Sequence, residues 1–237
     1  MQTKHISTQL IDHDYTAPDN YAALQLPSYR ASTILFDNTA ALARNNSGQP
    51  PGYTYGLHGT PSSLTLQERL ATLEGGQHCL LLPSGLAAIS LVNMALLAPG
   101  DELLLPENVY GPSQNLAQHE LQKFGITPRS YQPLALADLA AKINAKTKLV
   151  WIEAPGSCTM EFPDLLGILH LCREHGVLCA IDNTWGAGLA FCAFDVAASG
   201  LGADISVQAL TKFPCGGGDV LMGSVITRAR ALHQQLS

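Results

Sequence analysis

Residues 79–98 read CLLLPSGLAAISLVNMALLA, a stretch of twenty residues without a charge. Its length would suit a membrane-spanning helix. However, Pro83, Ser84 and Gly85 interrupt it, and no cluster of Lys or Arg flanks it. The part before Pro83 is typical of a buried strand and the part from Gly85 of a helix. We therefore expect a strand, a tight turn and a helix, with the membrane span as the alternative.

The same alternation continues along the chain. A helix is predicted from Pro61 to the Gly75-Gly76 pair. Further strands are predicted at CLLLP (79–83), ELLLP (102–106), KLVWIEAP (148–155), VLCAID (177–182) and ADISVQAL (203–210), and TPRSYQP (127–133) is a further unit of the pattern. Helical spacing occupies residues 112–124, 136–143 and 164–176, and the closing SVITRARALHQQLS (224–237) is interpreted as the first turns of a helix. This order predicts an α/β fold with a mainly parallel, doubly wound sheet and helices on both faces.

The first sixty residues have a different pattern. They include TAPDN (16–20) and NNSGQPPGY (45–53), with only scattered apolar residues. We expect residues 1–60 to form an arm that makes contacts, and residues 61–237 to form one large domain. The N-terminus lacks the apolar segment of a secretory signal.

Composition excludes several classes of protein. Charged residues make up only 14% of the chain and hydrophobic residues 46%, which indicates surface that is buried against another subunit. The net charge of -6 gives no basic patch for nucleic acid. The six cysteines form no CxxC pair and no zinc-ligand spacing, so we expect reduced thiols, no metal and a cytoplasmic location.

Polar residues follow the predicted strands, where a doubly wound sheet binds its ligands. These residues are Ser84 and Gly85, Asn108 and Tyr110, the segment 155–157, Asp182 and Asn183, and Thr211 and Lys212. We expect the five strand ends to meet at one edge.

The residues at this edge have the chemistry to hold pyridoxal phosphate. Gly85 and Leu86 begin a helix, whose free N–H groups suit a phosphate. Asp182 could pair with the protonated pyridine nitrogen, and Tyr110 could stack on the ring. Lys212 could form a Schiff base with the aldehyde. Ser206 and Thr211 have hydroxyl groups for the phosphate, and Gly216, Gly217 and Gly218 allow close passage of the backbone.

Each residue also has an ordinary structural role as an alternative. Lys212 could be a surface lysine, Ser84-Gly85 a helix cap, and Asp182 a turn residue. Tyr110 could pack with a satisfied hydroxyl group.

The order and spacing of four motifs resemble the Cys/Met-metabolism family of pyridoxal-phosphate enzymes. These motifs are YGLHGTP (55–61), PSGLAA (83–88), IDNTW (181–185) and SVQALTKFPCGGGD (206–219). The resemblance implies a fold-type I large domain, Lys212 as the Schiff-base lysine, Asp182 on the pyridine nitrogen and Tyr110 on the ring. It also implies Gly85, Leu86, Ser206 and Thr211 at the phosphate, with Tyr55 reaching it from the neighbouring subunit of a homo-oligomer, a dimer of dimers in the family.

Within the family, EAPGS (153–157) and Trp185 resemble the bacterial cystathionine β-lyases. The implied reaction is β-elimination of L-cystathionine to homocysteine, pyruvate and ammonia, in methionine biosynthesis. A γ-lyase or γ-synthase is the alternative enzyme.

The sequence departs from the family pattern in three ways. Leu57, followed by His58, stands where many members have a phosphate-binding arginine, and Gly217 stands where they have a histidine. The family's C-terminal small domain, with its carboxylate-binding arginine, is expected to be absent. A truncated, catalytically inert protein that binds the cofactor or a partner is therefore a second hypothesis.

Overall fold

The computed structural model describes residues 5–11, 27–45 and 53–237. The chain divides into two compact units, residues 1–69 and 70–237. Within the first unit lie α1 (Ile6–Ile11), α2 (Thr39–Asn45), η1 (Gly56–His58) and the first part of α3 (Pro61–Glu74). The segment TAPDN and residues 46–52 lie outside the described residues.

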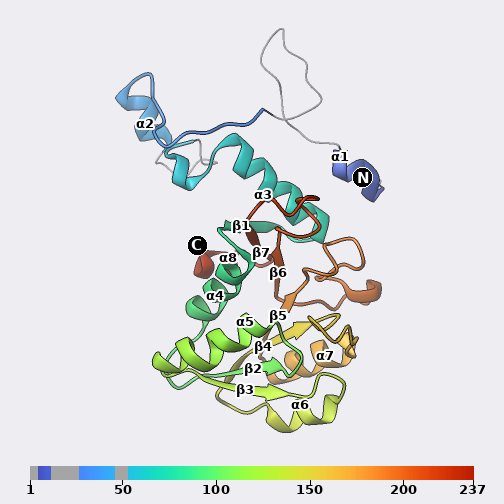
Figure 1. Ribbon diagram of the computed structural model, residues 1–237. Helices are drawn as coiled ribbons and strands as arrows, with labels where there is room; N and C mark the ends of the chain where they lie inside the picture. Colours follow the sequence, from blue (N-terminus) through green and yellow to red (C-terminus); the bar gives the residue numbers. More distant parts are fainter. Residues whose placement is uncertain (1–4, 12–26, 46–52) are drawn as a thin grey trace. The chain divides into compact units, whose positions relative to one another are not determined.

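The second unit is built on a seven-stranded sheet (Figure 1). The strands are β1 (His78–Leu82), β2 (Glu102–Pro106), β3 (Thr127–Tyr131), β4 (Thr147–Glu153), β5 (Leu178–Asp182), β6 (Ile205–Ala209) and β7 (Gly223–Thr227). Their order across the sheet is β1-β7-β6-β5-β4-β2-β3. The strands β3, β2, β4, β5 and β6 are parallel, whereas β7 is antiparallel to both neighbours. The predicted α/β fold with a mainly parallel sheet is confirmed.

One predicted element was wrong. The closing segment does not begin as a helix, because Gly223–Thr227 forms the strand β7 and the helix α8 (Arg230–Leu236) starts only afterwards. All five residues of β7 are buried, between β1 and β6. The β-branched Val225, Ile226 and Thr227 suit that position.

Helices cover the two faces of the sheet. On one face lie α4 (Gly85–Leu96), α8 and the pair α5 (Gly111–Asn115) and η2 (Leu116–Leu121), whose second member is a π-helix. On the other lie α6 (Leu136–Lys142), α7 (Leu165–His175) and the segment around η3 (Val196–Ala198). The strand-turn-helix interpretation of residues 79–98 is confirmed by β1 and α4, and in the described ranges no helix is long and apolar enough to cross a membrane.

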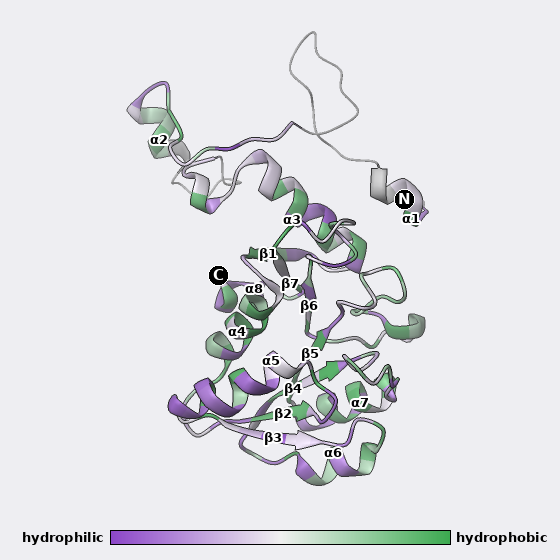
Figure 2. Ribbon diagram, viewed as in Figure 1, coloured by the Kyte–Doolittle hydropathy of each residue, from purple (hydrophilic) through white to green (hydrophobic). Residues whose placement is uncertain are grey.

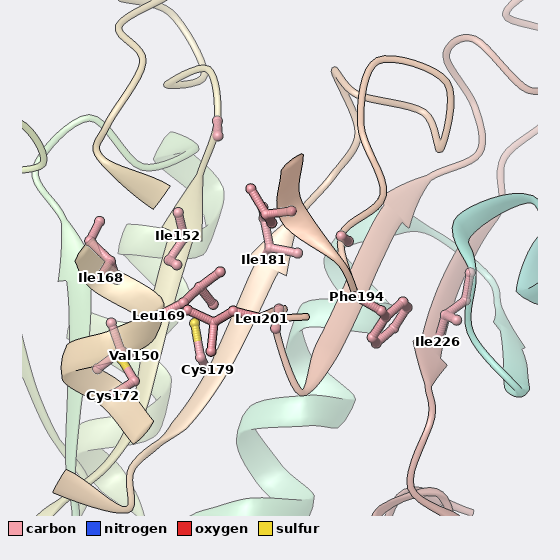
Figure 3. Packing of buried hydrophobic residues seen from close by; sticks show 14 of the residues in the cluster. Val150, Ile152, Ile168, Leu169, Cys172, Cys179, Ile181, Phe194, Leu201 and Ile226 are labelled. Atoms are coloured by element: carbon pink, nitrogen blue, oxygen red, sulfur yellow. The ribbon is translucent and has the colours of Figure 1, made fainter. Parts of the chain in front are cut away.

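Alternating side chains of the strands supply the two cores. On β4, Leu149 and Trp151 face the core under α4, whereas Val150 and Ile152 face the core under α7. Figure 3 shows Val150 and Ile152 beside Ile168 and Leu169 of α7. Figure 2 shows β2, β4 and β5 coloured as hydrophobic strands, as expected where both faces of a parallel sheet are covered. This rigid double-sided packing holds the strand ends in place.

Candidate active site

Lys212 lies in the turn that follows β6, between two aromatic rings. Its Nζ is 5.7 Å from the centre of the Tyr110 ring and 5.8 Å from that of Trp185. The Trp185 ring in turn lies 5.8 Å from the ring of Phe213. Tyr110 follows β2 and Trp185 follows β5, so the ends of three strands meet here as expected. Both rings remain more than a third exposed, which leaves the amine accessible from solvent.

Two carboxyl groups lie on neighbouring strands behind this lysine. Glu153 ends β4 and Asp182 ends β5, and the register of the parallel pair places them opposite each other. Burial raises the pKa of Asp182, while Thr184 hydrogen bonds and the positive charge of Lys212 oppose that rise. Burial and the charge of Asp182 raise the pKa of Glu153 to about 8. The edge therefore combines an amine with two carboxyl groups that resist ionisation.

Backbone contacts hold both carboxyl groups in place. The Thr184 N–H donates to Asp182 Oδ1 over 3.0 Å, and the Thr184 hydroxyl accepts the N–H of Ala209 on β6 over 2.9 Å. The N–H of Tyr110 donates to Glu153 Oε1 over 2.6 Å. Asp182 is thus fixed to the strand that leads to Lys212, and Glu153 to the segment that carries the tyrosine.

The N-terminus of α4 approaches the same edge. Ser84 caps the helix, because its Oγ accepts the Ala87 N–H over 3.0 Å. This cap leaves the N–H groups of Gly85 and Leu86 without an acceptor inside the helix, as in a helical anion site. A Cβ at Gly85 would lie 2.6 Å from the Cβ of Ala209. Glycine therefore lets the helix begin against β6, three residues before Lys212.

Thr211 lies beside the lysine and is half-buried. Its hydroxyl donates to the carbonyl oxygen of Met222 over 3.4 Å and accepts the Met222 N–H over 3.3 Å. The structure therefore brings Thr211 to the edge but gives its hydroxyl a backbone partner.

The expectation for Ser206 needs correction. Its side chain is fully buried, and its hydroxyl donates to Oε2 of Glu74 at the end of α3. Asn183 Nδ2 donates to the same oxygen over 2.9 Å, and Gln208 Nε2 donates to Oε1. Ser206 and Gln208 point to one face of β6 because side chains alternate along a strand. Ser206 therefore belongs to a buried polar cluster and does not join the residues at the strand ends.

The glycines after Lys212 turn the chain. Gly216 and Gly218 have φ angles of 70° and 74°, which favour residues without a Cβ. The Gly218 N–H donates to the sulfur of Cys215 over 3.0 Å, and the backbone N–H groups of Gly217 and Gly218 lower the pKa of that thiol. The segment forms a tight turn beside the lysine.

Tyr55 and His58 belong to the first unit. The ring of Tyr55 meets that of His58 edge to face, with centres 5.7 Å apart. His58 Nδ1 also lies 3.1 Å from Thr54 Oγ1. The imidazole of His58 is therefore held against Tyr55, one residue after Leu57, the position where the family resemblance expects an arginine.

Two acidic residues were missing from the predicted site. Glu153 had a signal, because it is the charged last residue of the apolar strand KLVWIE. Glu74 had none, since a glutamate before Gly-Gly is typical of a solvated helix end. Only its contacts with Asn183 and β6 distinguish it.

A sequence model of the Cys/Met metabolism PLP-dependent enzymes matches residues 7–237. The chain belongs to this family. Pyridoxal phosphate is the cofactor of the family, as expected from the residues at the strand ends.

Two curated relatives illustrate the range of activities in the family. A cystathionine beta-lyase of Bordetella avium is 37% identical over 99% of this chain and 59% of its own length. An L-methionine gamma-lyase of Pseudomonas putida is 32% identical over 93% of this chain and 54% of its own length. The chain thus spans less than two thirds of the relatives that it matches.

A solved structure shares the fold. It is a Campylobacter jejuni protein, provisionally described as an O-acetylhomoserine (thiol)-lyase, that contains a pyridoxyl-lysine phosphate. The TM-score is 0.87 and the identity 27%, over 98% of this chain and 56% of that one.

Proposed function

We propose that this chain carries the cofactor-binding region of a pyridoxal-phosphate-dependent carbon–sulfur lyase. The observation that carries the proposal is the meeting of Lys212, Tyr110 and Asp182 at one edge of the sheet, in a chain of this family. Lys212 Nζ would bind the aldehyde carbon, and the ring of Tyr110 would lie against the pyridine ring. Burial raises the pKa of Asp182, and a protonated pyridine nitrogen would provide a positive charge that favours its ionised form.

The phosphate would bind at the start of α4. The N–H groups of Gly85 and Leu86 are available there, and Thr211 lies close to the lysine in sequence. Ser206 has no part in this proposal, since its hydroxyl is committed to Glu74.

When bound, the cofactor supplies an electron sink for the negative charge that forms at the substrate Cα. The protein must move the proton. Lys212 is the base that we assign to the Cα proton, since its amine is flexible and lies between the rings of Tyr110 and Trp185, where the cofactor would bind. The same ammonium group can then donate a proton to the departing sulfur.

The proposed reaction is β-elimination of L-cystathionine, which with water yields homocysteine, pyruvate and ammonia. The identity to the Bordetella avium cystathionine beta-lyase supports this choice. A γ-lyase is the second candidate, because the Pseudomonas putida methionine gamma-lyase is also similar over most of this chain.

We also propose that the protein is a cytoplasmic homo-oligomer. Residues 1–60 would act as an arm at the subunit contact, and Tyr55 would reach the phosphate of the neighbouring subunit. The exposed Tyr55 and its contact with His58 agree with this role. His58 would then replace the family's arginine.

The test is the absorption spectrum of the protein after addition of pyridoxal phosphate. We expect an absorption band at the edge of the visible range that disappears in Lys212→Ala. The band should remain in the control Lys123→Ala, since Lys123 is exposed and paired with Glu120. We expect Lys212→Ala to lower elimination by about 10³-fold. A band that is unchanged in Lys212→Ala would refute the assignment.

The keto acid distinguishes the two reactions. Cystathionine should give pyruvate by β-elimination, whereas 2-oxobutyrate would indicate γ-elimination. A lysine-dependent band without either product would indicate an intact cofactor pocket without turnover.

A further inference from the structure

Glu153 is nearly fully buried, and the proposed reaction assigns it no step. Only 4% of its surface is exposed. Its carboxyl group receives the N–H of Tyr110 over 2.6 Å. That hydrogen bond joins the end of β4 to the start of α5, where the ring beside Lys212 is attached. The position of the ring therefore depends on Glu153.

A second set of contacts fastens the same segment. Asn108 Nδ2 donates to Thr159 Oγ1 over 3.1 Å and to Glu161 Oε2 over 3.0 Å. The carbonyl oxygen of Asn108 accepts the Ser157 N–H over 3.3 Å. The turn after β2 is thus held to the segment after β4 through Asn108 as well as through Tyr110, and Glu153 provides the buried contact.

Three ionisable groups face Glu153 from neighbouring elements. Asp182 on β5 is its register partner. Lys212 follows β6 and attracts it, while Tyr131 on β3 interacts with it through charge. Burial and Asp182 outweigh Lys212, so the pKa of Glu153 rises to about 8. At neutral pH most of the molecules therefore carry a proton on Glu153.

We propose that Glu153 is a positioning residue which, as a neutral carboxyl group, holds Tyr110 against Lys212 and adds no second negative charge beside Asp182. The proposal rests on the proposed function, which assigns the pyridine nitrogen to Asp182 alone. A second charge beside Asp182 would compete for Lys212 and for the pyridine nitrogen.

The first experiment needs no cofactor. The ¹³C carboxyl signal of Glu153 is assigned by its loss in Glu153→Gln and followed against pH. We expect an inflection near the value of about 8, which Asp182→Asn shifts downward and Lys212→Ala shifts upward. An inflection at about pH 4.3, the ordinary pKa of a glutamate side chain, would overturn the proposal.

The second experiment follows the ring of Tyr110 by ¹⁹F spectroscopy with fluorotyrosine, assigned through Tyr110→Phe. Glu153→Gln retains an oxygen that can accept the Tyr110 N–H. In this variant the ¹⁹F signal of the ring at position 110 should therefore match that of the wild type at pH 7. Glu153→Ala should displace the signal. An undisplaced signal in Glu153→Ala would contradict a positioning role, and if that variant does not fold, the carboxyl titration still decides.

The third experiment measures the affinity for pyridoxal phosphate from pH 6.5 to 9.5. We expect Glu153→Gln to bind as the wild type does at pH 7 and to lack the wild-type change near pH 8. Glu153→Ala should bind about tenfold more weakly. The matched control is Glu102→Gln, which removes a carboxylate from the opposite end of the sheet.

The outcomes separate the two proposals. A pH-dependent change that persists in Glu153→Gln would overturn the role of Glu153 and leave the lyase intact. If the wild type shows no lysine-dependent absorption band after addition of pyridoxal phosphate, the proposed function is refuted. The carboxyl titration would still report on Glu153.

Discussion

The two ends of the sheet hold glutamates of opposite character. Glu102 begins β2 and is in register with Thr147 at the start of β4, whereas Glu153 ends β4. At about 3.3 Å per residue, roughly 20 Å of strand separates them. Hydrogen bonds from Arg129 and Asn144 lower the pKa of Glu102, while burial raises that of Glu153.

The difference shows what each charge does for the fold. Glu102 is paired with Arg129 over 2.9 Å and ties β2 to β3. Glu153 and Asp182 are instead held side by side, which disfavours their ionised forms. At the end of the sheet that holds Glu102, an ion pair stabilises the fold. At the end that holds Glu153 and Asp182, buried ionisable groups are retained at a cost to stability, as at functional sites.

The largest expected effect concerns the pH dependence of stability. The folded-state pKa of Glu153 lies above its ordinary value, so its contribution is full at low pH and declines as the pH rises from about 4.5 to about 8. At about 1.4 kcal/mol per pKa unit, the upper limit of the loss is on the order of 5 kcal/mol. Urea unfolding of wild type and Glu153→Gln should diverge over this range, and parallel curves would contradict the comparison.

Removal of the Glu74 carboxyl group should lower the free energy of unfolding, because Glu74 accepts buried hydrogen bonds from β6 and from the residue after β5. In Glu74→Ala, the buried donors of Asn183, Ser206 and Gln208 lose their acceptor. We expect a loss of about 3 kcal/mol in the free energy of unfolding.

Glu74→Gln is the matched control for this prediction. Gln208 Oε1 has no hydrogen-bond partner in the described residues, so a flip of the Gln208 amide could accept the new donor. The loss in the free energy of unfolding of Glu74→Gln should therefore stay below about 1 kcal/mol. Equal losses in both variants would show that the cluster is not organised by hydrogen bonds.

Gly85→Ala should separate α4 from β6. The new Cβ would meet the Cβ of Ala209 at 2.6 Å, and such overpacking costs about 2 kcal/mol. The affinity for pyridoxal phosphate should fall with it, because the helix N-terminus moves. Gly100→Ala is a control with open space around the new Cβ, although its φ of 96° adds strain. Unchanged cofactor affinity in Gly85→Ala would remove this helix from the site.

The smallest effect is expected at the amino end. Glu102→Gln should cost about 0.5 kcal/mol at pH 7, since the pair with Arg129 is partly exposed. The lowered pKa means that this contribution exists above pH 4.5 and is lost as the pH falls below it. Thermal unfolding at pH 3 and pH 7 measures it, and a cost that grows at pH 3 would reverse the assigned sign.

The sequence alone predicted the parallel α/β fold and the strand ends that carry Tyr110, Asp182 and Lys212. These follow from local patterns, since apolar runs, turn residues and helical spacing are each readable within a few positions. The parallel sheet then brings strand ends together whatever the side chains are.

Only the tertiary structure decided which of these groups contact one another. The register of β4 and β5 pairs Glu153 with Asp182, and the hydroxyl group of Ser206 donates to Glu74, the last residue of α3. The closing strand β7 likewise depends on burial between β1 and β6. Each of these contacts joins residues distant in sequence, and side-chain partners across a sheet are set by register and burial, which local patterns do not specify.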